Sequence, residues 1–139
     1  MGASGWIYKV AFQPDVRQAL EDLRWQVLRS GEYYRDDGGD EPASPDDALE
    51  RQPEDGTHSI IDMMNGLSPT PEFGTVSPLT EQQLLAVFGT STPSSESVET
   101  WLDHGGDNGL RDRWEGLVVT GYTTDGAPEF LFFAGASGD

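Results

Sequence analysis

The first third of the chain passes from an alternating pattern of apolar residues to a helical one. Over residues 5–12 every second residue from Trp6 onward is apolar, which predicts a strand with one apolar face. Residues 14–30 repeat apolar side chains at helical spacing, with Pro14 expected in the first turn and Gly31 as the stop. The polar face of this predicted helix carries Arg17, Glu21, Asp22, Arg24 and Arg29.

The last third of the chain returns to a strand-like pattern. Residues 114–122 and 129–134 flank a turn that contains Asp125-Gly126, which together predict a β-hairpin. The apolar run from Phe130 to Phe133 is continuous and does not alternate. A continuous run is typical of a central strand that is covered on both faces.

The middle of the chain contains start signals for three short helices. Ser44-Pro45 is a capping residue followed by proline, and the Thr80 to Gln83 segment has the sequence of a capping box. Thr92-Pro93 predicts the third start, with an end before Gly105.

Between these helices lie two segments with weaker patterns. Residues 57–63 contain a β-branched pair and predict a second strand, although the same stretch is also compatible with the start of a helix. Residues 65–78 are rich in Pro and Gly and predict a surface loop.

We therefore expect residues 1–139 to form a single α+β domain. The expected sheet is small and mostly antiparallel, built from the N-terminal strand and the C-terminal β-hairpin, and packed by one long and two or three short helices.

The charge of the chain is strongly negative and unevenly distributed. It has 25 acidic and 8 basic residues, a formal net charge of -17. Residues 1–35 are nearly balanced, whereas residues 36–139 carry 21 acids against three arginines. Such a field repels phosphate, so we expect no direct binding of nucleic acid.

Our expectations about cellular location and cofactors are based mainly on motifs that the sequence does not contain. It has no cysteine, no signal-like start and no apolar run of about 18 residues, so we expect a cytoplasmic protein that does not enter a membrane. It has no phosphate-binding glycine motif, and His58 and His104 do not have zinc-site spacing. We expect no cofactor and no metal. The sequence favours a non-enzymatic protein without deciding the question.

The acidic stretch that follows residue 35 is the main candidate for function. We predict that it covers a basic surface of a protein partner, a toxin or a nucleic-acid-binding protein, in the manner of an inhibitor or immunity protein. The residues of this predicted patch are Asp36, Asp37, Asp40, Glu41, Asp46, Asp47, Glu50, Glu54 and Asp55.

Two alternatives remain open. One is a small-molecule-binding domain or enzyme with a pocket formed by Trp6, Tyr8, His58 and Asp62, because Asp62 alone among the acids has apolar sequence neighbours. The other is a halophilic-type domain, in which the charge has no partner and serves solubility in salt.

Segments spread along most of the chain resemble a type found among small uncharacterised acidic bacterial proteins. The segments are Gly5-Trp6-x-Tyr8, Pro14-Asp15-x-x-x-Ala19-Leu20-x-x-Leu23-Arg24, Gly31-Glu32-Tyr33-Tyr34, Gly56-Thr57-His58-Ser59-Ile60-Ile61-Asp62 and Phe132-Phe133-x-Gly135-x-Ser137-Gly138-Asp139. That type has no established activity, so the resemblance assigns no functional residue. In size, acidity and lack of a catalytic motif, the chain is also similar to immunity proteins, which neutralise toxins with basic active sites.

Overall fold

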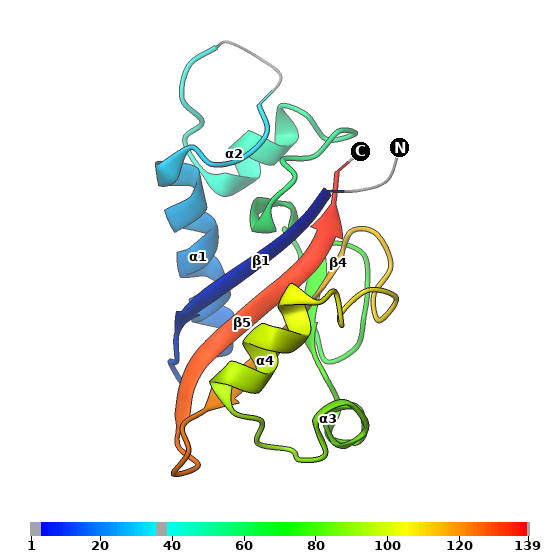
Figure 1. Cartoon of the computed structure of the whole chain (residues 1–139). Coiled ribbons are helices and arrows are strands. Elements are labelled where there is room, and N and C mark those ends of the chain that lie inside the picture. The colour runs from blue at the N-terminus through cyan, green and yellow to red at the C-terminus, as the bar shows by residue number, and fades with distance from the viewer. Residues whose placement is uncertain (1–3, 36–38, 139) are drawn as a thin grey trace.

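The computed structural model describes residues 4–35 and 39–138 of the chain. Within these residues a five-stranded mixed sheet has helices on both faces (Figure 1). Its order is β1-β5-β4-β3-β2, and the α+β prediction is confirmed. The strands are β1 (Ser4–Ala11), β2 (Gly66–Leu67), β3 (Thr75–Pro78), β4 (Glu115–Tyr122) and β5 (Pro128–Ser137).

The long strands of the sheet follow the predicted pattern. β5 is antiparallel to both β1 and β4, and Gly126 in the hairpin turn has a φ of +85°, which suits glycine. Phe133 packs into the core on one face of β5, and Phe132 packs into the core on the other. The continuous apolar run therefore marks a strand covered on both faces, as expected.

The loop predicted over residues 65–78 also contains the two short strands that the sequence did not predict. β2 runs parallel to β3, and β3 runs parallel to β4. They extend the sheet beyond the hairpin and make it mixed. Their two and four residues are too few to give a periodic signal between the Pro and Gly residues around them.

The long helix α1 (Val16–Ser30) covers one face of the sheet together with α2 (Pro45–Glu50). The Asp15 side chain caps α1 by accepting a hydrogen bond from the Gln18 N–H at 3.0 Å. Pro14 therefore lies before the cap and not in the first helical turn, which corrects the prediction. Gly31 ends the helix in the left-handed conformation, as expected.

Residues 57–63 do not form the predicted second strand. They contain a short 3₁₀ turn, η1 (Ile60–Asp62), which is close to the helical alternative. The Ser59 hydroxyl accepts a hydrogen bond from the Ile61 N–H, and the Asp62 carboxylate accepts one from the Thr57 N–H. These local bonds to side chains occupy backbone donors that a strand would use in its ladder.

Arg24 also departs from its predicted place on the polar face of α1. It is 2% exposed and holds α1, α2 and η1 together. Its guanidinium donates to the Ile61 carbonyl at 2.6 Å and to the carboxylate of Asp46 at 2.9 Å, and it pairs with Glu21 at 3.2 Å. A buried cation is retained where hydrogen bonds satisfy it, as they do here.

The other face of the sheet is covered by α3 (Glu81–Phe88) and α4 (Ser95–Asp103). The capping box of Thr80 and Gln83 is present, and α4 begins after Ser94, close to the predicted start. No residue of α3 is buried, and Leu85 is half exposed. In the described part of the chain, no helix has both the length and the apolar character needed to cross a membrane.

Candidate protein-binding surface

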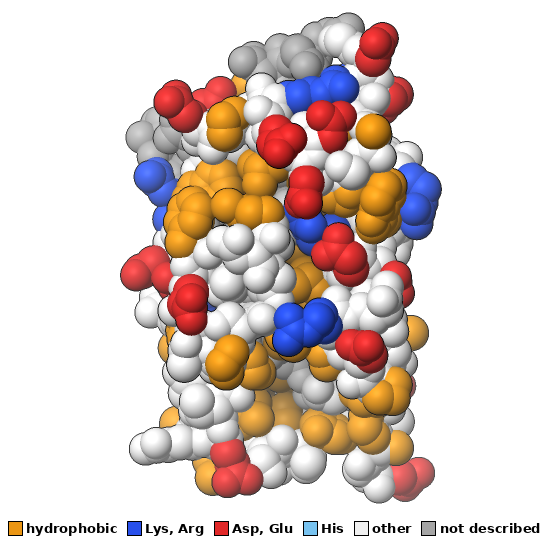
Figure 2. Space-filling view, turned by 180° about the vertical axis from the view of Figure 1, so that it is seen from behind, with side chains coloured by type: hydrophobic (Ala, Val, Ile, Leu, Met, Phe, Trp, Pro, Cys, Tyr) orange, Lys and Arg blue, Asp and Glu red, His pale blue; other side chains and the backbone are white. Residues whose placement is uncertain are grey.

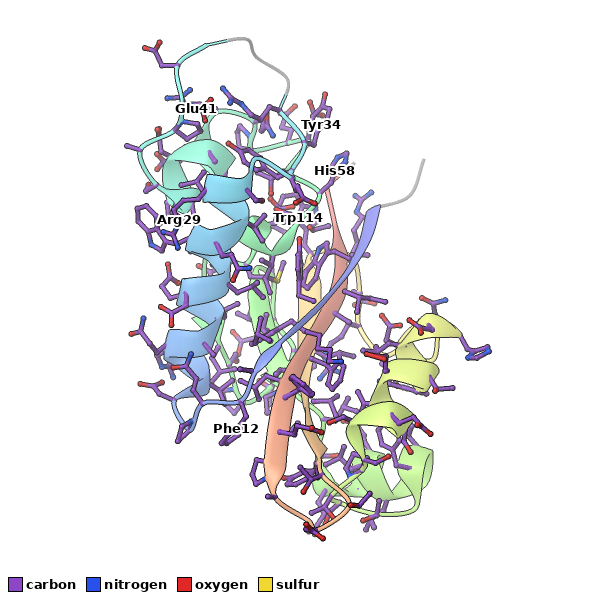
Figure 3. The ribbon with its side chains drawn as sticks, turned by 60° about the vertical axis from the view of Figure 1, so that its left-hand side comes forward. Phe12, Arg29, Tyr34, Glu41, His58 and Trp114 are labelled. Carbon is purple, nitrogen blue, oxygen red and sulfur yellow. The ribbon has the colours of Figure 1, made fainter. Side chains whose placement is uncertain are left out.

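The predicted acidic patch falls at one end of the molecule, on α2 and the loops beside it (Figure 3 labels Glu41 there). We call the part that the structure describes the α2 acidic surface. It consists of Asp40, Glu41, Asp46, Asp47, Glu50, Glu54 and Asp55. Asp36 and Asp37 belong to the predicted patch but lie outside the described residues.

Arginines of the same region pair with three of these acids. Arg35 lies 3.1 Å from Glu41, and Arg51 lies 3.2 Å from Asp47. Asp46 is the acid bound by Arg24. These pairs reduce the negative field at three of the predicted positions, and they are visible only in three dimensions.

The Asp47 carboxylate stabilises the loop that precedes α2. It accepts a hydrogen bond from the Ala43 N–H at 2.9 Å, and this bond is the main reason that its pKa lies below the ordinary value. Its neighbour Arg51 lowers the pKa further. Asp47 is therefore a weaker candidate for partner binding than the sequence suggested.

Asp40, Glu50, Glu54 and Asp55 carry the uncompensated charge of the α2 acidic surface. Among residues 4–35 and 39–138, none of these four carboxylates has an ion pair within 4.0 Å. Asp40, Glu50 and Glu54 are exposed and Asp55 is partly buried. Exposed and unpaired carboxylates are the ones that can meet a cationic partner.

An apolar cavity opens directly beside this unpaired charge. It has a volume of about 500 Å³ and is lined by Leu49, Met64, Phe73 and Trp114, with Asp46 and Glu50 among its walls. We call it the Phe73 cavity. Figure 2 shows hydrophobic side chains gathered on the upper part of this face, with acidic side chains beside them.

Phe73 and Trp114 provide the aromatic wall of the cavity. Their rings stack with centroids 5.3 Å apart and planes at 23°. Phe73 is 57% exposed, the largest exposed fraction among the large apolar residues of the described chain. An aromatic side chain exposed to this degree beside a cavity is typical of an interface anchor.

The backbone holds Trp114 in an unusual conformation. Its φ is +72°, which is rare for a bulky residue and costs about 1–3 kcal/mol. Its N–H donates to the Ala136 carbonyl at 2.8 Å, and its own carbonyl accepts from the Gly74 N–H at 2.7 Å. Gly56 leaves room for the indole, because a Cβ there would lie 2.8 Å from the ring. Such strain often accompanies a functional position.

The four residues of the alternative pocket are arranged differently. Asp62 is completely buried, and one of its oxygens accepts from the Thr57 N–H at 2.7 Å. Its other oxygen accepts from the Ser137 hydroxyl at 2.5 Å. The same hydroxyl accepts from the Trp6 indole N–H at 3.0 Å. Trp6 and Asp62 are thus joined through Ser137, which the sequence did not single out.

Tyr8 lies against this polar cluster, and His58 lies at its edge. The Tyr8 ring is 5.8 Å from the Trp6 ring, and burial is the main cause of its raised pKa. His58 stacks on Tyr34 with centroids 4.6 Å apart, as the labels in Figure 3 show. Among five surface cavities of the described chain, one is lined by Trp6 and none by Tyr8, His58 or Asp62. The cluster is packed, and it fastens the end of β5 to η1.

Ser137 and Thr57 carry only a faint signal in the sequence. The segments Gly2-Ala3-Ser4-Gly5 and Gly135-Ala136-Ser137-Gly138 have the same four residues, and Ser4 pairs with Ser137 across β1 and β5.

No metal site is formed within the described ranges, which hold no group of three or more His, Cys, Asp or Glu residues placed to bind an ion.

Comparisons of the chain with protein-family models, with curated proteins and with solved structures found no match. The resemblance to small acidic bacterial proteins therefore stays a prediction.

Proposed function

We propose that this protein is a non-enzymatic inhibitor of the immunity type, which binds a basic surface of a protein partner. The observation that carries the proposal is the junction of unpaired carboxylates with an exposed aromatic cavity. Glu50 belongs to both, because it lines the Phe73 cavity and has no ion pair among the described residues.

The two parts of the surface suit two stages of association. The negative field of the chain accelerates the approach of a basic partner and sets its orientation. The Phe73 cavity then accepts an apolar side chain of that partner, and well-packed central anchors of this kind dominate binding free energy. The partner class this favours is a toxin or a nucleic-acid-binding protein, whose basic surface would otherwise meet phosphate.

The test is affinity capture from the native cell extract on the immobilised protein, with two double charge reversals compared. Glu50→Lys with Glu54→Lys changes the α2 acidic surface. Glu81→Lys with Asp125→Lys raises the net charge equally on α3 and the β4–β5 turn, at the other end of the molecule (Figure 1). We expect a basic protein to be retained at low salt by the wild type and the control pair, and to be lost from the first pair.

Salt supplies the second comparison. Raising ionic strength shortens the range of the charge interactions, so retention must fall with salt if carboxylates contribute to it. The proposal is wrong if no basic protein is retained at low salt, or if retention ignores salt. Equal loss in both double variants would indicate an effect of net charge alone and would contradict a binding site at the α2 acidic surface.

A further inference from the structure

A second cavity lies on the opposite face of the sheet from the Phe73 cavity. It has a volume of about 520 Å³ and sits between the C-terminal end of α4 and the strands β1, β4 and β5. In Figure 1, α4 lies in front of β5. Three small residues on two neighbouring strands, Gly5, Ala134 and Ala136, leave the space open. We call it the Arg111 cavity, and its volume is typical of small-molecule sites.

Among the described residues, Arg111 is the one cation that lines this cavity. Its Nε donates to the Ser77 hydroxyl at 3.0 Å, and its Nη1 donates to the Leu110 carbonyl at 2.8 Å. Its Nη2 donates to the carbonyls of Ser77 and Pro78. A guanidinium has five N–H donors, so one Nη1 hydrogen has no acceptor among the described residues.

The charge of Arg111 is also incompletely balanced. In a chain with 25 acidic residues, this half-buried guanidinium has no carboxylate within 4.0 Å among the residues described. Burial lowers its pKa, with Glu115 nearby acting in the opposite direction. A partly buried cation that is held by carbonyls and a hydroxyl retains the capacity to bind an anionic group.

Carboxylates line the same cavity. Asp103 at the end of α4, Asp107 in the following loop and Glu115 at the start of β4 are all part of its wall. The C-terminal end of a helix adds partial negative charge on that side. The wall of the cavity therefore carries both signs of charge, one guanidinium and three carboxylates. The net charge of -17 would repel a ligand that carries only a negative charge. A ligand with one positive and one negative group is neutral overall, so the field of the protein does not repel it.

We propose that the Arg111 cavity binds a small zwitterion, an α-amino acid with an apolar side chain. Its carboxylate binds the free N–H of Arg111, and its ammonium group faces Asp103 and Asp107. Its side chain lies on the apolar floor formed by Ile7, Leu117 and Ala134. Ile7 is 47% exposed on this floor, and a bound side chain would cover it.

The ligand class is tested by NMR titration of the ¹⁵N-labelled protein with L-leucine, N-acetyl-L-leucine and L-leucinamide. The second probe lacks the ammonium group and the third lacks the carboxylate. We expect L-leucine to shift amides around Gly105, Gly109 and Ala136 with a Kd of about 1 mM. Each capped probe loses one charge-assisted contact and should bind at least about tenfold more weakly. No saturable shift with up to about 10 mM L-leucine, or equal binding of all three probes, overturns the proposal.

The location is tested by filling the cavity without disturbing Arg111. A Cβ on Gly5 would meet only the Gly135 carbonyl, at 3.8 Å, so Gly5→Leu leaves the fold intact and occupies the cavity. Ala11→Leu is the matched control, because Ala11 lies on the same face of β1, is exposed and is outside the cavity. We expect Gly5→Leu to weaken L-leucine binding at least about tenfold and Ala11→Leu to leave it unchanged. Thermal unfolding confirms that both variants are folded, and undiminished binding by Gly5→Leu overturns the proposal.

Discussion

Replacing Arg24 by methionine removes a cation that joins three elements while keeping most of the side-chain volume. Arg24 donates to the Ile61 carbonyl through both Nε and Nη2, and Ile61 is completely buried. The variant leaves that carbonyl without its partner, which costs about 1–3 kcal/mol. The lost ion pairs with Glu21 and Asp46 cost less, because those side chains are 46% and 66% exposed and become hydrated.

The sum is a loss of about 2–4 kcal/mol in the free energy of unfolding. It lies below the full effect of stranding a buried charge, about 3–5 kcal/mol, because no carboxylate is left buried. Urea denaturation followed by tryptophan fluorescence measures it, provided that the m-value stays constant.

Arg29→Met is the matched control for this measurement. Arg29 is exposed on the same helix, and the change in charge is identical. Arg29→Met should lower the free energy of unfolding by no more than about 1 kcal/mol, which is the contribution of a favourable charge near a helix C-terminus. If Arg24→Met destabilises the protein no more than Arg29→Met does, the assignment of Arg24 as the link between α1, α2 and η1 is refuted.

Three further predictions concern stability. Gly56→Ala should lower the free energy of unfolding by at least about 3 kcal/mol in chemical denaturation, because the new Cβ would lie within 3 Å of three groups. Gly31→Ala is the control, since its Cβ would meet open space, and it should lower the free energy by about 1 kcal/mol. Equal losses would contradict the packing around Gly56. Ser137→Ala leaves a buried indole N–H and a carboxylate oxygen without their bond and should cost about 2–4 kcal/mol, so a neutral result would argue against the polar cluster. The pKa of Tyr8 is raised in the folded protein, so its contribution to the free energy of unfolding is complete below the unfolded pKa of 10.0 and is lost as pH rises through the folded pKa. Tyr8→Phe should abolish this loss of stability when unfolding is measured over a series of alkaline pH values.

The elements that the sequence predicted well are those whose signals are local. The β4–β5 hairpin follows from a turn dipeptide between apolar runs, and α1 follows from a helical stripe ended by Gly31. The short strand β3 has no such signal. It is held by its parallel pairing with β4, whose residues lie about 40 positions further along the chain.

The candidate site was predictable only in part for the same reason. The acidic residues of α2 are visible as composition, but their pairing with Arg35 and Arg51 depends on the fold. Phe73 and Trp114 come from separate segments, and nothing in either segment indicates that they stack beside Glu50. The burial of Arg24 was missed because its position on the helical wheel adjoins the apolar stripe.

Hydrogen–deuterium exchange of the protein, with and without its captured partner, locates the binding surface on the chain. Backbone amides covered by an interface exchange more slowly. We expect added protection over residues 49–56 and 72–74, where Glu50, Glu54, Asp55 and Phe73 lie. We expect none over α3 and the β4–β5 turn. Protection confined to those distant segments, or spread evenly over the chain, would contradict the claim that the protein binds through the α2 acidic surface and the Phe73 cavity.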